Sequence, residues 1–328
     1  MDVGVIGIGM MGRNHARIYS ELKSVGDLVV FDTNTAYAKE FARQHDVHLA
    51  GSIQELYRMV EAVSICVPTK HHYQIAETAF RNSNSRPSPG LGDMPRVRTL
   101  AGTAARCGTH LLIEKPICST SREAEKLQNL VSTDQVVGVG HIERFNPIID
   151  EIARIITEPL YVEIKRHNPA SARINDSTVV EDLMIHDIDI VVHRLFHGNY
   201  RLRCAGTRDI CGALFQFNST PVYLSASRKS SKKMRTILIE EEDVTIEGDF
   251  MNQEVYIHRK PNQYELENER YVQENIIEKV LVNKVEPLKV ELSTFLDCIN
   301  ADREFPVTPA QATENLRICE RIREGCIK

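Results

Sequence analysis

Three ionisable side chains, Lys115, Asp182 and His186, are of the types that together activate a hydroxyl group by removing its proton and polarising its oxygen. Asp182 and His186 lie four residues apart, so on a helix they share one face. An imidazole beside a carboxylate is a suitable general base. Lys115, in Glu114-Lys115-Pro116, can polarise a substrate oxygen and lower the pKa of an alcohol. The structural alternatives are a surface ion pair and a helix-terminal Asp with a capped core His.

A glycine pattern at the N-terminus predicts a dinucleotide site. A short apolar strand precedes Gly7, Gly9 and Gly12, which are spaced as Gly-x-Gly-x-x-Gly. Gly7 permits the tight turn, Gly9 lets the backbone approach a pyrophosphate, and Gly12 allows close helix–strand packing. The N–H groups where the next helix begins, at Met10 and Met11, attract the phosphates. An ordinary glycine turn is the alternative.

An acidic residue follows the next strand at the distance that such a site requires. The strand over 28–31 ends in Asp32, twenty residues after Gly12, and Thr33 follows it. A carboxylate there accepts both ribose hydroxyls of an adenosine and repels a 2′-phosphate. Asp32 therefore predicts NAD as the cofactor, in preference to NADP, and Thr33 is a further candidate cofactor contact.

Two further strand ends carry candidate cofactor contacts, because open α/β sheets bind ligands outside the carboxyl ends of their strands. The apolar run 62–67 ends in Pro68 and Thr69, and His72 follows. The run 110–113 ends in Glu114 and Lys115. For His72, a surface histidine at a helix start is an equally good interpretation.

The elements that must position these residues alternate between strand and helix up to residue 140. This order predicts an α/β fold whose N-terminal Rossmann domain, residues 1–140, is a doubly wound parallel sheet. Beyond it, 141–328 predicts an α+β domain with a large, mostly antiparallel open sheet, a helix over 180–196 and two closing helices. This second domain is expected to bind substrate and to mediate oligomerisation.

One segment, 81–105, breaks the alternation. It is rich in Asn, Ser, Pro, Gly and Arg with almost no apolar periodicity, which predicts an inserted loop. A phosphate or partner patch formed by its arginines is the weaker alternative.

The overall composition excludes several classes of protein. The chain has 328 residues, a net charge of −5 and a pI of about 6.2, so a nucleic-acid partner is not expected. No apolar run has the length that spans a membrane, and the first strand leaves no room for a signal peptide. The eight cysteines form no Cys-x-x-Cys pair, so we expect thiols in a reducing cytoplasm and no metal site.

Taken together, the glycine pattern, Glu114-Lys115-Pro116 and Asp182-x-x-x-His186 resemble the glucose-fructose oxidoreductase, inositol dehydrogenase and MocA (Gfo/Idh/MocA) family over nearly the whole chain. The resemblance implies an oxidoreductase in which Lys115, Asp182 and His186 are the catalytic set. It also implies a homodimer or homotetramer formed through the sheet of the second domain. The segment 81–105 departs from the family pattern.

The run from Val139 to Pro147 and the run from Asp182 to Asp189 are similar, more narrowly, to the UDP-N-acetylglucosamine 3-dehydrogenases. That resemblance implies oxidation of a nucleotide-sugar 3-hydroxyl to a ketone. Lys115, Asp182 and His186 would then contact the sugar. Guanidinium groups suit its diphosphate, and the basic residues that flank the expected crevice are Arg144, Lys165, Arg166 and Arg173. Ordinary surface charge is an equally good account of Lys165 and Arg173.

Two other functions remain open at this stage. The first is dehydrogenation of a free polyol or sugar, such as inositol. The second is a noncatalytic NAD-binding regulator, against which the retention of Lys115, Asp182 and His186 argues.

Overall fold

The computed structural model describes residues 1–83, 108–169, 177–260, 264–267, 270–273 and 276–326. The chain divides into two compact units. The first unit comprises Met1–Gly140 and Leu288–Thr313, and the second comprises His141–Pro287 and Glu314–Lys328.

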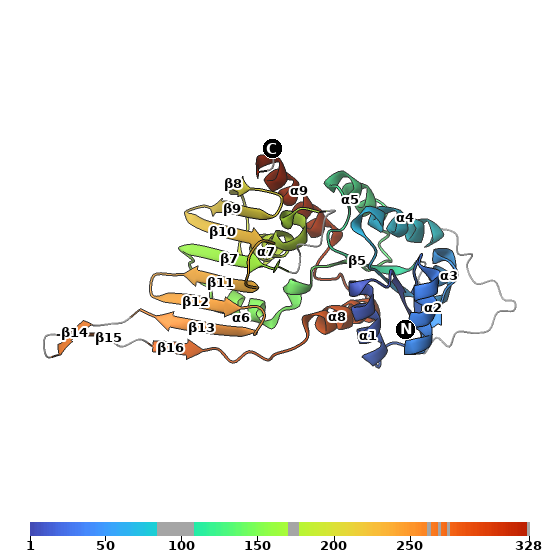
Figure 1. Cartoon of the computed structure of the whole chain (residues 1–328), viewed down its shortest axis with the longest axis horizontal. Helices are drawn as coiled ribbons and strands as arrows, with labels where there is room; N and C mark the ends of the chain where they lie inside the picture. The colour runs from blue at the N-terminus through green and yellow to red at the C-terminus, as the bar shows by residue number, and fades with distance from the viewer. Residues whose placement is uncertain (84–107, 170–176, 261–263, 268–269, 274–275, 327–328) are drawn as a thin grey trace. The chain divides into compact units, whose positions relative to one another are not determined.

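Within the described residues, the first unit holds a six-stranded parallel sheet in the order β3-β2-β1-β4-β5-β6 (Figure 1). Its strands are β1 (Val3–Ile6), β2 (Leu28–Phe31), β3 (His48–Leu49), β4 (Ala62–Ile65), β5 (His110–Glu114) and β6 (Val137–Gly140). This is the strand order of a Rossmann fold, and it confirms the predicted doubly wound sheet.

Helices cover both faces of this sheet, with α4 and α5 on the upper side in Figure 1 and α1 and α8 on the lower side. The helices of the unit are α1 (Met10–Glu21), α2 (Thr35–His45), α3 (Ile53–Met59), η1 (Thr69–His71), α4 (His72–Ser83), α5 (Ser121–Gln128) and α8 (Pro287–Ala301). Because both faces are covered, every residue of β1, β4, β5 and β6 is buried.

The first three residues of the segment 81–105, which the sequence predicts to be an inserted loop, belong instead to α4, because this helix runs to Ser83. The rest of the predicted insertion lies in 84–107, outside the described residues.

The second unit holds an eight-stranded sheet in the order β16-β13-β12-β11-β7-β10-β9-β8. Among these strands β7 and β10 pair in parallel, and the other described pairs are antiparallel. Its strands are β7 (Tyr161–His167), β8 (Tyr200–Gly206), β9 (Ile210–Phe217), β10 (Thr220–Ser227), β11 (Met234–Glu240), β12 (Val244–Asp249), β13 (Glu254–Arg259) and β16 (Ile276–Lys279). A separate hairpin joins β14 (Tyr264–Glu267) to β15 (Arg270–Gln273).

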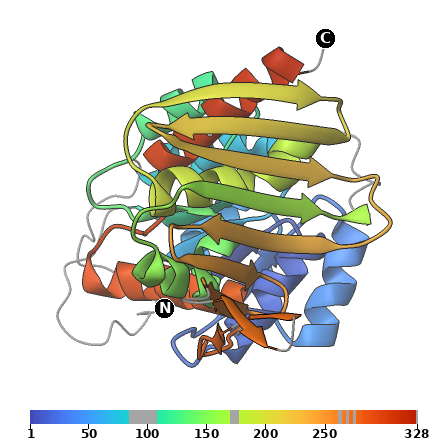
Figure 2. The same cartoon turned by 90° about the vertical axis from the view of Figure 1, so that its left-hand side faces the viewer.

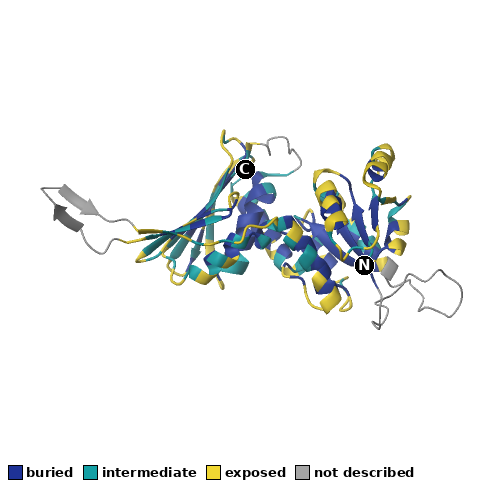
Figure 3. Ribbon diagram, turned by 90° about the horizontal axis from the view of Figure 1, so that it is seen from below, coloured by how far each residue is buried: buried dark blue, intermediate teal, exposed yellow. Residues whose placement is uncertain are grey.

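Helices pack on one face of this large sheet, as the predicted α+β domain requires. They are η2 (Ile142–Phe145), α6 (Pro147–Ile155), the helix over residues 180–195 and α9 (Pro309–Cys326). Alternate strand residues meet these helices in one apolar core, coloured dark blue in Figure 3. Figure 2 looks onto the other face of the sheet, where the helices of this unit are not seen in front of the strands.

The helix over residues 180–195 is not a regular α-helix. Its first turn, η4 (Val180–Met184), and its last turn, η5 (Val191–Leu195), are π-helical, and α7 (Ile185–Ile190) lies between them. A π turn closes its hydrogen bonds at i→i+5, which changes the faces that the side chains share.

The C-terminal segment departs from the predicted single domain over 141–328, because residues 288–313 belong to the first unit. Phe305 fills the space beside Gly138, where a Cβ atom would lie 2.4 Å from its ring. The N–H of Val139 donates to the carbonyl of Val307 at 3.1 Å. These contacts attach the segment to the edge strand β6.

Candidate active site

The turn after β1 uses each of its three glycines differently. Gly7 has a φ of 89°, and a Cβ atom there would lie 2.8 Å from the carbonyl oxygen of Cys66. At Gly12, a Cβ atom would lie 1.8 Å from the carbonyl oxygen of Gly7, so only glycine lets α1 approach the turn. At Gly9, nothing lies within 4 Å of the position of a Cβ atom. The backbone at Gly9 is therefore open where α1 begins with Met10.

Asp32 is fixed beside this turn by backbone donors. Its Oδ2 accepts from the N–H of Ile8 at 2.8 Å, and its Oδ1 accepts from the N–H of Asn34 at 2.8 Å. Each carboxylate oxygen has a second lone pair for a ribose hydroxyl. Thr33, the next residue, is exposed. The open backbone at Gly9, the start of α1 and Asp32 together fit a dinucleotide.

His72 is buried, so the structure differs from the surface histidine that we considered. Its Nδ1 lies 2.9 Å from the carbonyl oxygen of Pro116, and its Nε2 lies 2.8 Å from that of Val67. Burial lowers the pKa of this imidazole, with the carbonyl contacts acting in the opposite direction. His72 therefore joins the loop after β4, which holds Pro68 and Thr69, to the loop after β5, and we assign it no cofactor contact.

Glu114 has a buried partner that the sequence analysis did not find. Its Oε1 lies 3.0 Å from Nε2 of His15 on α1, and its Oε2 accepts from the N–H of Lys115 at 3.3 Å. Burial acts to raise the pKa of Glu114, but the His15 hydrogen bond and the charges of His15 and Lys115 outweigh burial and lower it. Glu114 is thus an ionised link between β5 and α1. His15 lies three residues after Gly12, one turn along the same helix face.

Lys115 is half-buried at the carboxyl end of β5, and its peptide bond to Pro116 is cis. The strand places Lys115 at the same sheet edge as the glycine turn and Asp32, because all six strands are parallel.

In the second unit, Asp182 and His186 lie on either side of the change from η4 to α7. Oδ2 of Asp182 lies 3.3 Å from Nη2 of the buried Arg228. The ring of His186 lies edge-on to His141, with 6.1 Å between the ring centres. The expected Asp182–His186 pair thus gains two neighbours that the sequence analysis missed.

Arg228 fastens the start of this helix. Its guanidinium donates to the carbonyls of Ser177 at 3.0 Å and Thr178 at 2.9 Å. Arg228 directly follows β10. An arginine at the end of a strand with alternating polarity is expected to be exposed, so the sequence did not indicate that Arg228 is buried.

Two of the three predicted diphosphate-binding arginines are internal ion-pair partners. Arg144 donates through Nε to Oδ2 of Asp189 at 2.7 Å, and Arg166 donates through Nε to Oδ1 of Asp187 at 2.8 Å. Both arginines are buried. Both guanidiniums are thus engaged by internal carboxylates, which argues against Arg144 and Arg166 as diphosphate ligands. Arg173 lies outside the described residues.

These ion pairs hold the helix that carries His186. Asp189 also accepts from Nδ2 of Asn315 at 2.8 Å, and its Oδ1 lies 3.8 Å from Nδ1 of His141. Burial acts to raise the pKa of Asp189, but His141 and Arg144 outweigh burial and lower it. The helix is thereby joined to η2 and to α9.

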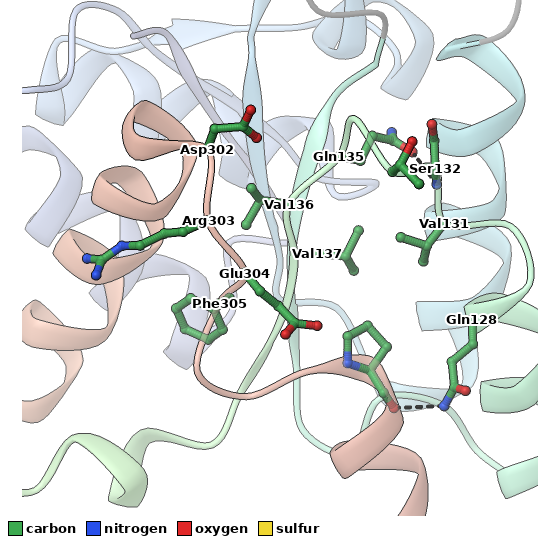
Figure 4. Close-up of a pocket in the computed structure, with 12 residues that line it drawn as sticks. Gln128, Val131, Ser132, Gln135, Val136, Val137, Asp302, Arg303, Glu304 and Phe305 are labelled. Atoms are coloured by element: carbon green, nitrogen blue, oxygen red, sulfur yellow. Dashed lines mark hydrogen bonds between the residues drawn. The ribbon is translucent and has the colours of Figure 1, made fainter.

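A cavity of about 420 Å³ in the first unit is not placed for this chemistry (Figure 4). Residues that line it include Gln135, Val137 and Phe305. Val137 is the first residue of β6, so this cavity opens at the amino ends of the strands, opposite the edge where such sheets bind ligands.

Among the described residues, no group of His, Cys, Asp and Glu is placed to hold a metal ion. In the same part of the chain, no helix combines the length and apolarity that a membrane span needs.

The fold and the glycine turn define a dinucleotide-binding Rossmann domain. Residues 1–85 match the family model described as "Oxidoreductase family, NAD-binding Rossmann fold". A UDP-N-acetylglucosamine 3-dehydrogenase from Acidithiobacillus ferrooxidans is 30% identical over 269 residues, which are 79% of this chain and 77% of that protein. The chain belongs to the Gfo/Idh/MocA family.

Other comparisons agree with this membership. The solved structure of the Acidithiobacillus ferrooxidans UDP-N-acetylglucosamine 3-dehydrogenase is 27% identical, with a TM-score of 0.80 over 99% of this chain and 97% of that chain. An inositol 2-dehydrogenase from Paracoccus denitrificans is 23% identical over 58% of this chain and 53% of that protein. A levoglucosan dehydrogenase solved with NADH and levoglucosan shares the fold, with a TM-score of 0.77 at 16% identity over 99% of this chain and 96% of that chain.

Proposed function

We propose that this oxidoreductase oxidises the 3-hydroxyl of UDP-N-acetylglucosamine to a ketone, with NAD as the preferred cofactor. The observation that carries the substrate is the 30% identity to a UDP-N-acetylglucosamine 3-dehydrogenase over 79% of the chain. Proteins of one fold act on many different substrates. The oxidoreductase class follows from the family, whereas the particular substrate is our proposal.

The preference for NAD rests on Asp32. Its carboxylate is held by the N–H groups of Ile8 and Asn34, so it cannot turn away from the ribose position without losing both hydrogen bonds. A fixed negative charge there accepts two ribose hydroxyls and repels a 2′-phosphate. The pyrophosphate would lie at Gly9–Met11, against the start of α1.

We assign each candidate catalytic side chain one task. When bound, the nicotinamide supplies the acceptor for the hydride. His186 takes the proton of the sugar hydroxyl, Asp182 and Lys115 contact the substrate, and Lys115 holds the oxygen while negative charge develops on it. Arg228, through its contact with Asp182, holds that carboxylate in place.

A turnover assay tests the substrate. The purified protein is mixed with NAD and, in turn, with UDP-N-acetylglucosamine, free N-acetylglucosamine and myo-inositol, and NADH absorbance is followed. We expect turnover with the nucleotide sugar and a product lighter by two hydrogens in mass spectrometry. Turnover with the free sugars alone would reject the nucleotide sugar.

Dehydrogenation of a free polyol is the second candidate, favoured by the similarity to an inositol 2-dehydrogenase over 58% of the chain. The same assay decides between the two, since myo-inositol carries no phosphate. We also propose a cytoplasmic location, in keeping with the free thiols of the described cysteines.

A further inference from the structure

A second cavity, of about 370 Å³, lies within the second unit. Its wall is formed by η2, by the start of β11 and by the turn between β12 and β13. Residues that line it include Glu143, Asn146, Lys233, Arg235 and Met251. Its volume is in the range of small-ligand sites.

The one carboxylate that lines this cavity, among the described residues, is already neutralised. Oε1 of Glu143 accepts from Nη1 of Arg166 at 2.8 Å and from Nη1 of Arg235 at 2.9 Å. Its Oε2 accepts from Nδ2 of Asn146 at 3.2 Å. Arg166 also pairs with Asp187, so two guanidiniums balance two carboxylates around the cavity wall.

Lys233 adds a positive charge that this balance does not include. The side chain is exposed, and in the described part of the chain it has no carboxylate partner. Burial, followed by the charge of Arg166, lowers the pKa of the Arg235 guanidinium, so an anion that reached Arg235 would relieve this cost. Met251, which is 45% exposed, offers an apolar contact at the rim.

Arg235 connects this cavity to the helix that carries His186, because Glu143 accepts from both Arg235 and Arg166. Arg166 joins the cavity wall to Asp187, which is the neighbour of His186 in the sequence. An anion bound at Lys233 and Arg235 would therefore be held by the same ion-pair network that positions α7.

We infer that this cavity binds the diphosphate group of the substrate through Lys233 and Arg235. This inference rests on the proposed nucleotide-sugar substrate. The diphosphate would then contact Lys233 and Arg235 in place of Arg144 and Arg166. The guanidiniums of Arg144 and Arg166 are already bound to Asp189 and Asp187. Lysine and arginine donors form charge-assisted hydrogen bonds with phosphate oxygens.

Calorimetric titration of the NAD-saturated protein with UDP, and separately with inorganic pyrophosphate, tests the inference. Lys233→Gln should weaken UDP binding about tenfold, the loss expected for one charged hydrogen bond. The matched control is Lys232→Gln, which removes an exposed charge from the preceding residue, which does not line the cavity. We expect this control to change UDP affinity by less than about twofold, since an exposed charge is screened by salt.

Steady-state kinetics give a second measurement. Lys233→Gln should raise KM for UDP-N-acetylglucosamine by the same factor and leave kcat unchanged, because the diphosphate is remote from the reacting carbon. Arg235→Lys keeps the charge beside Glu143 but loses the planar fork, so it should also weaken UDP binding.

Each outcome bears on one proposal. Equal UDP affinity in the wild type and Lys233→Gln, or no binding of either UDP or pyrophosphate, would overturn the inference. If UDP-N-acetylglucosamine is then still oxidised, the proposed function stands without it. Lys233-dependent UDP binding without oxidation of the nucleotide sugar would support the cavity and reject the proposed substrate.

Discussion

Lys115 is the candidate catalytic cation of the first unit, and its backbone position is unusually well defined. Glu114 accepts from its N–H, and His72 holds the carbonyl of Pro116 on its other side. A backbone fixed on both sides places the Cα atom of Lys115 at the sheet edge, so only the side chain itself has to be ordered when substrate binds. The charge of Lys115 can therefore be removed without disturbing the cofactor turn around Gly9.

Replacement of Lys115 by methionine tests this role. We expect Lys115→Met to lower kcat by about a hundredfold to a thousandfold, the usual effect of removing one donor to a developing oxyanion. NAD affinity, measured by calorimetry, should stay near the wild-type value. Lys126→Met, on the exposed side of α5, is the control. Retained turnover with lost NAD affinity would make Lys115 a cofactor ligand instead.

Asp32 gives the second prediction at this scale. Wild-type protein should bind NAD more tightly than NADP, and Asp32→Ala should weaken NAD binding about tenfold or more, because two hydrogen bonds to a charged group are lost. NADP binding should be unchanged or tighter, since the repulsion of the 2′-phosphate is removed. Titration of both cofactors measures this, with Asp27→Asn as an exposed control. Tighter binding of NADP by the wild type would refute the NAD preference.

At the scale of elements, the buried ion pairs bind the helix over residues 180–195 to its unit. Arg166 lies on β7, Glu143 on η2 and Asp187 on α7, so one guanidinium joins three elements. Burial raises the pKa of Asp187, and the charge of Arg166 only partly offsets this effect. The ion pair therefore stabilises the folded protein by less than its short distances imply. The network fixes the arrangement of the helix.

Breaking this pair should be costly. Arg166→Met leaves Asp187 and Glu143 buried with fewer donors, and we expect the free energy of unfolding to fall by about 3–5 kcal/mol. Arg154→Met removes the exposed Arg154–Glu151 pair and should cost less than about 1 kcal/mol. Urea denaturation of both variants makes the comparison. An Arg166→Met variant as stable as the Arg154→Met control would show that the network contributes little.

The link between α1 and β5 makes stability depend on pH. The pKa of Glu114 is lowered in the folded protein, so its stabilisation is complete above the unfolded value of about 4.3 and is lost as pH falls through the folded value. Glu114→Gln should therefore be less stable than the wild type at neutral pH and should lose less stability on acidification. Urea denaturation across pH measures this, with the exposed Glu40→Gln as control. Parallel pH profiles for the wild type and Glu114→Gln would argue against the link.

What the sequence could predict at these scales depended on distance along the chain. The glycine turn and Asp32 are local, and their spacing predicted the dinucleotide site, while the alternation of strands and helices predicted the parallel Rossmann sheet. The role of Arg144 was not predictable, because its partner Asp189 lies 45 residues away. The π turn of η4 and the return of residues 288–313 to the first unit also depend on tertiary packing, which hydrophobic periodicity does not report.

At the scale of the whole molecule, one face of the eight-stranded sheet carries apolar side chains that the helices of its unit do not cover. Ile210 is 48% exposed, Leu214 38% and Ile277 56%. Exposed apolar side chains on a broad sheet face are typical of an interface. We propose that this face joins two copies of the chain in a homodimer, or in a homotetramer with a second interface.

A charge placed in this face should therefore separate the copies. Leu214→Lys on β9 buries an unpaired cation in the proposed interface, so light scattering after size-exclusion chromatography should give the mass of a single chain where the wild type gives twice or four times that mass. Leu130→Lys, a comparably exposed leucine of the first unit at 38%, is the control and should leave the mass unchanged. A wild type that elutes as a single chain of 37.2 kDa would refute the interface. A Leu214→Lys variant that keeps the wild-type mass would move the interface elsewhere, because an interface cannot bury two unpaired lysines without a large loss of affinity.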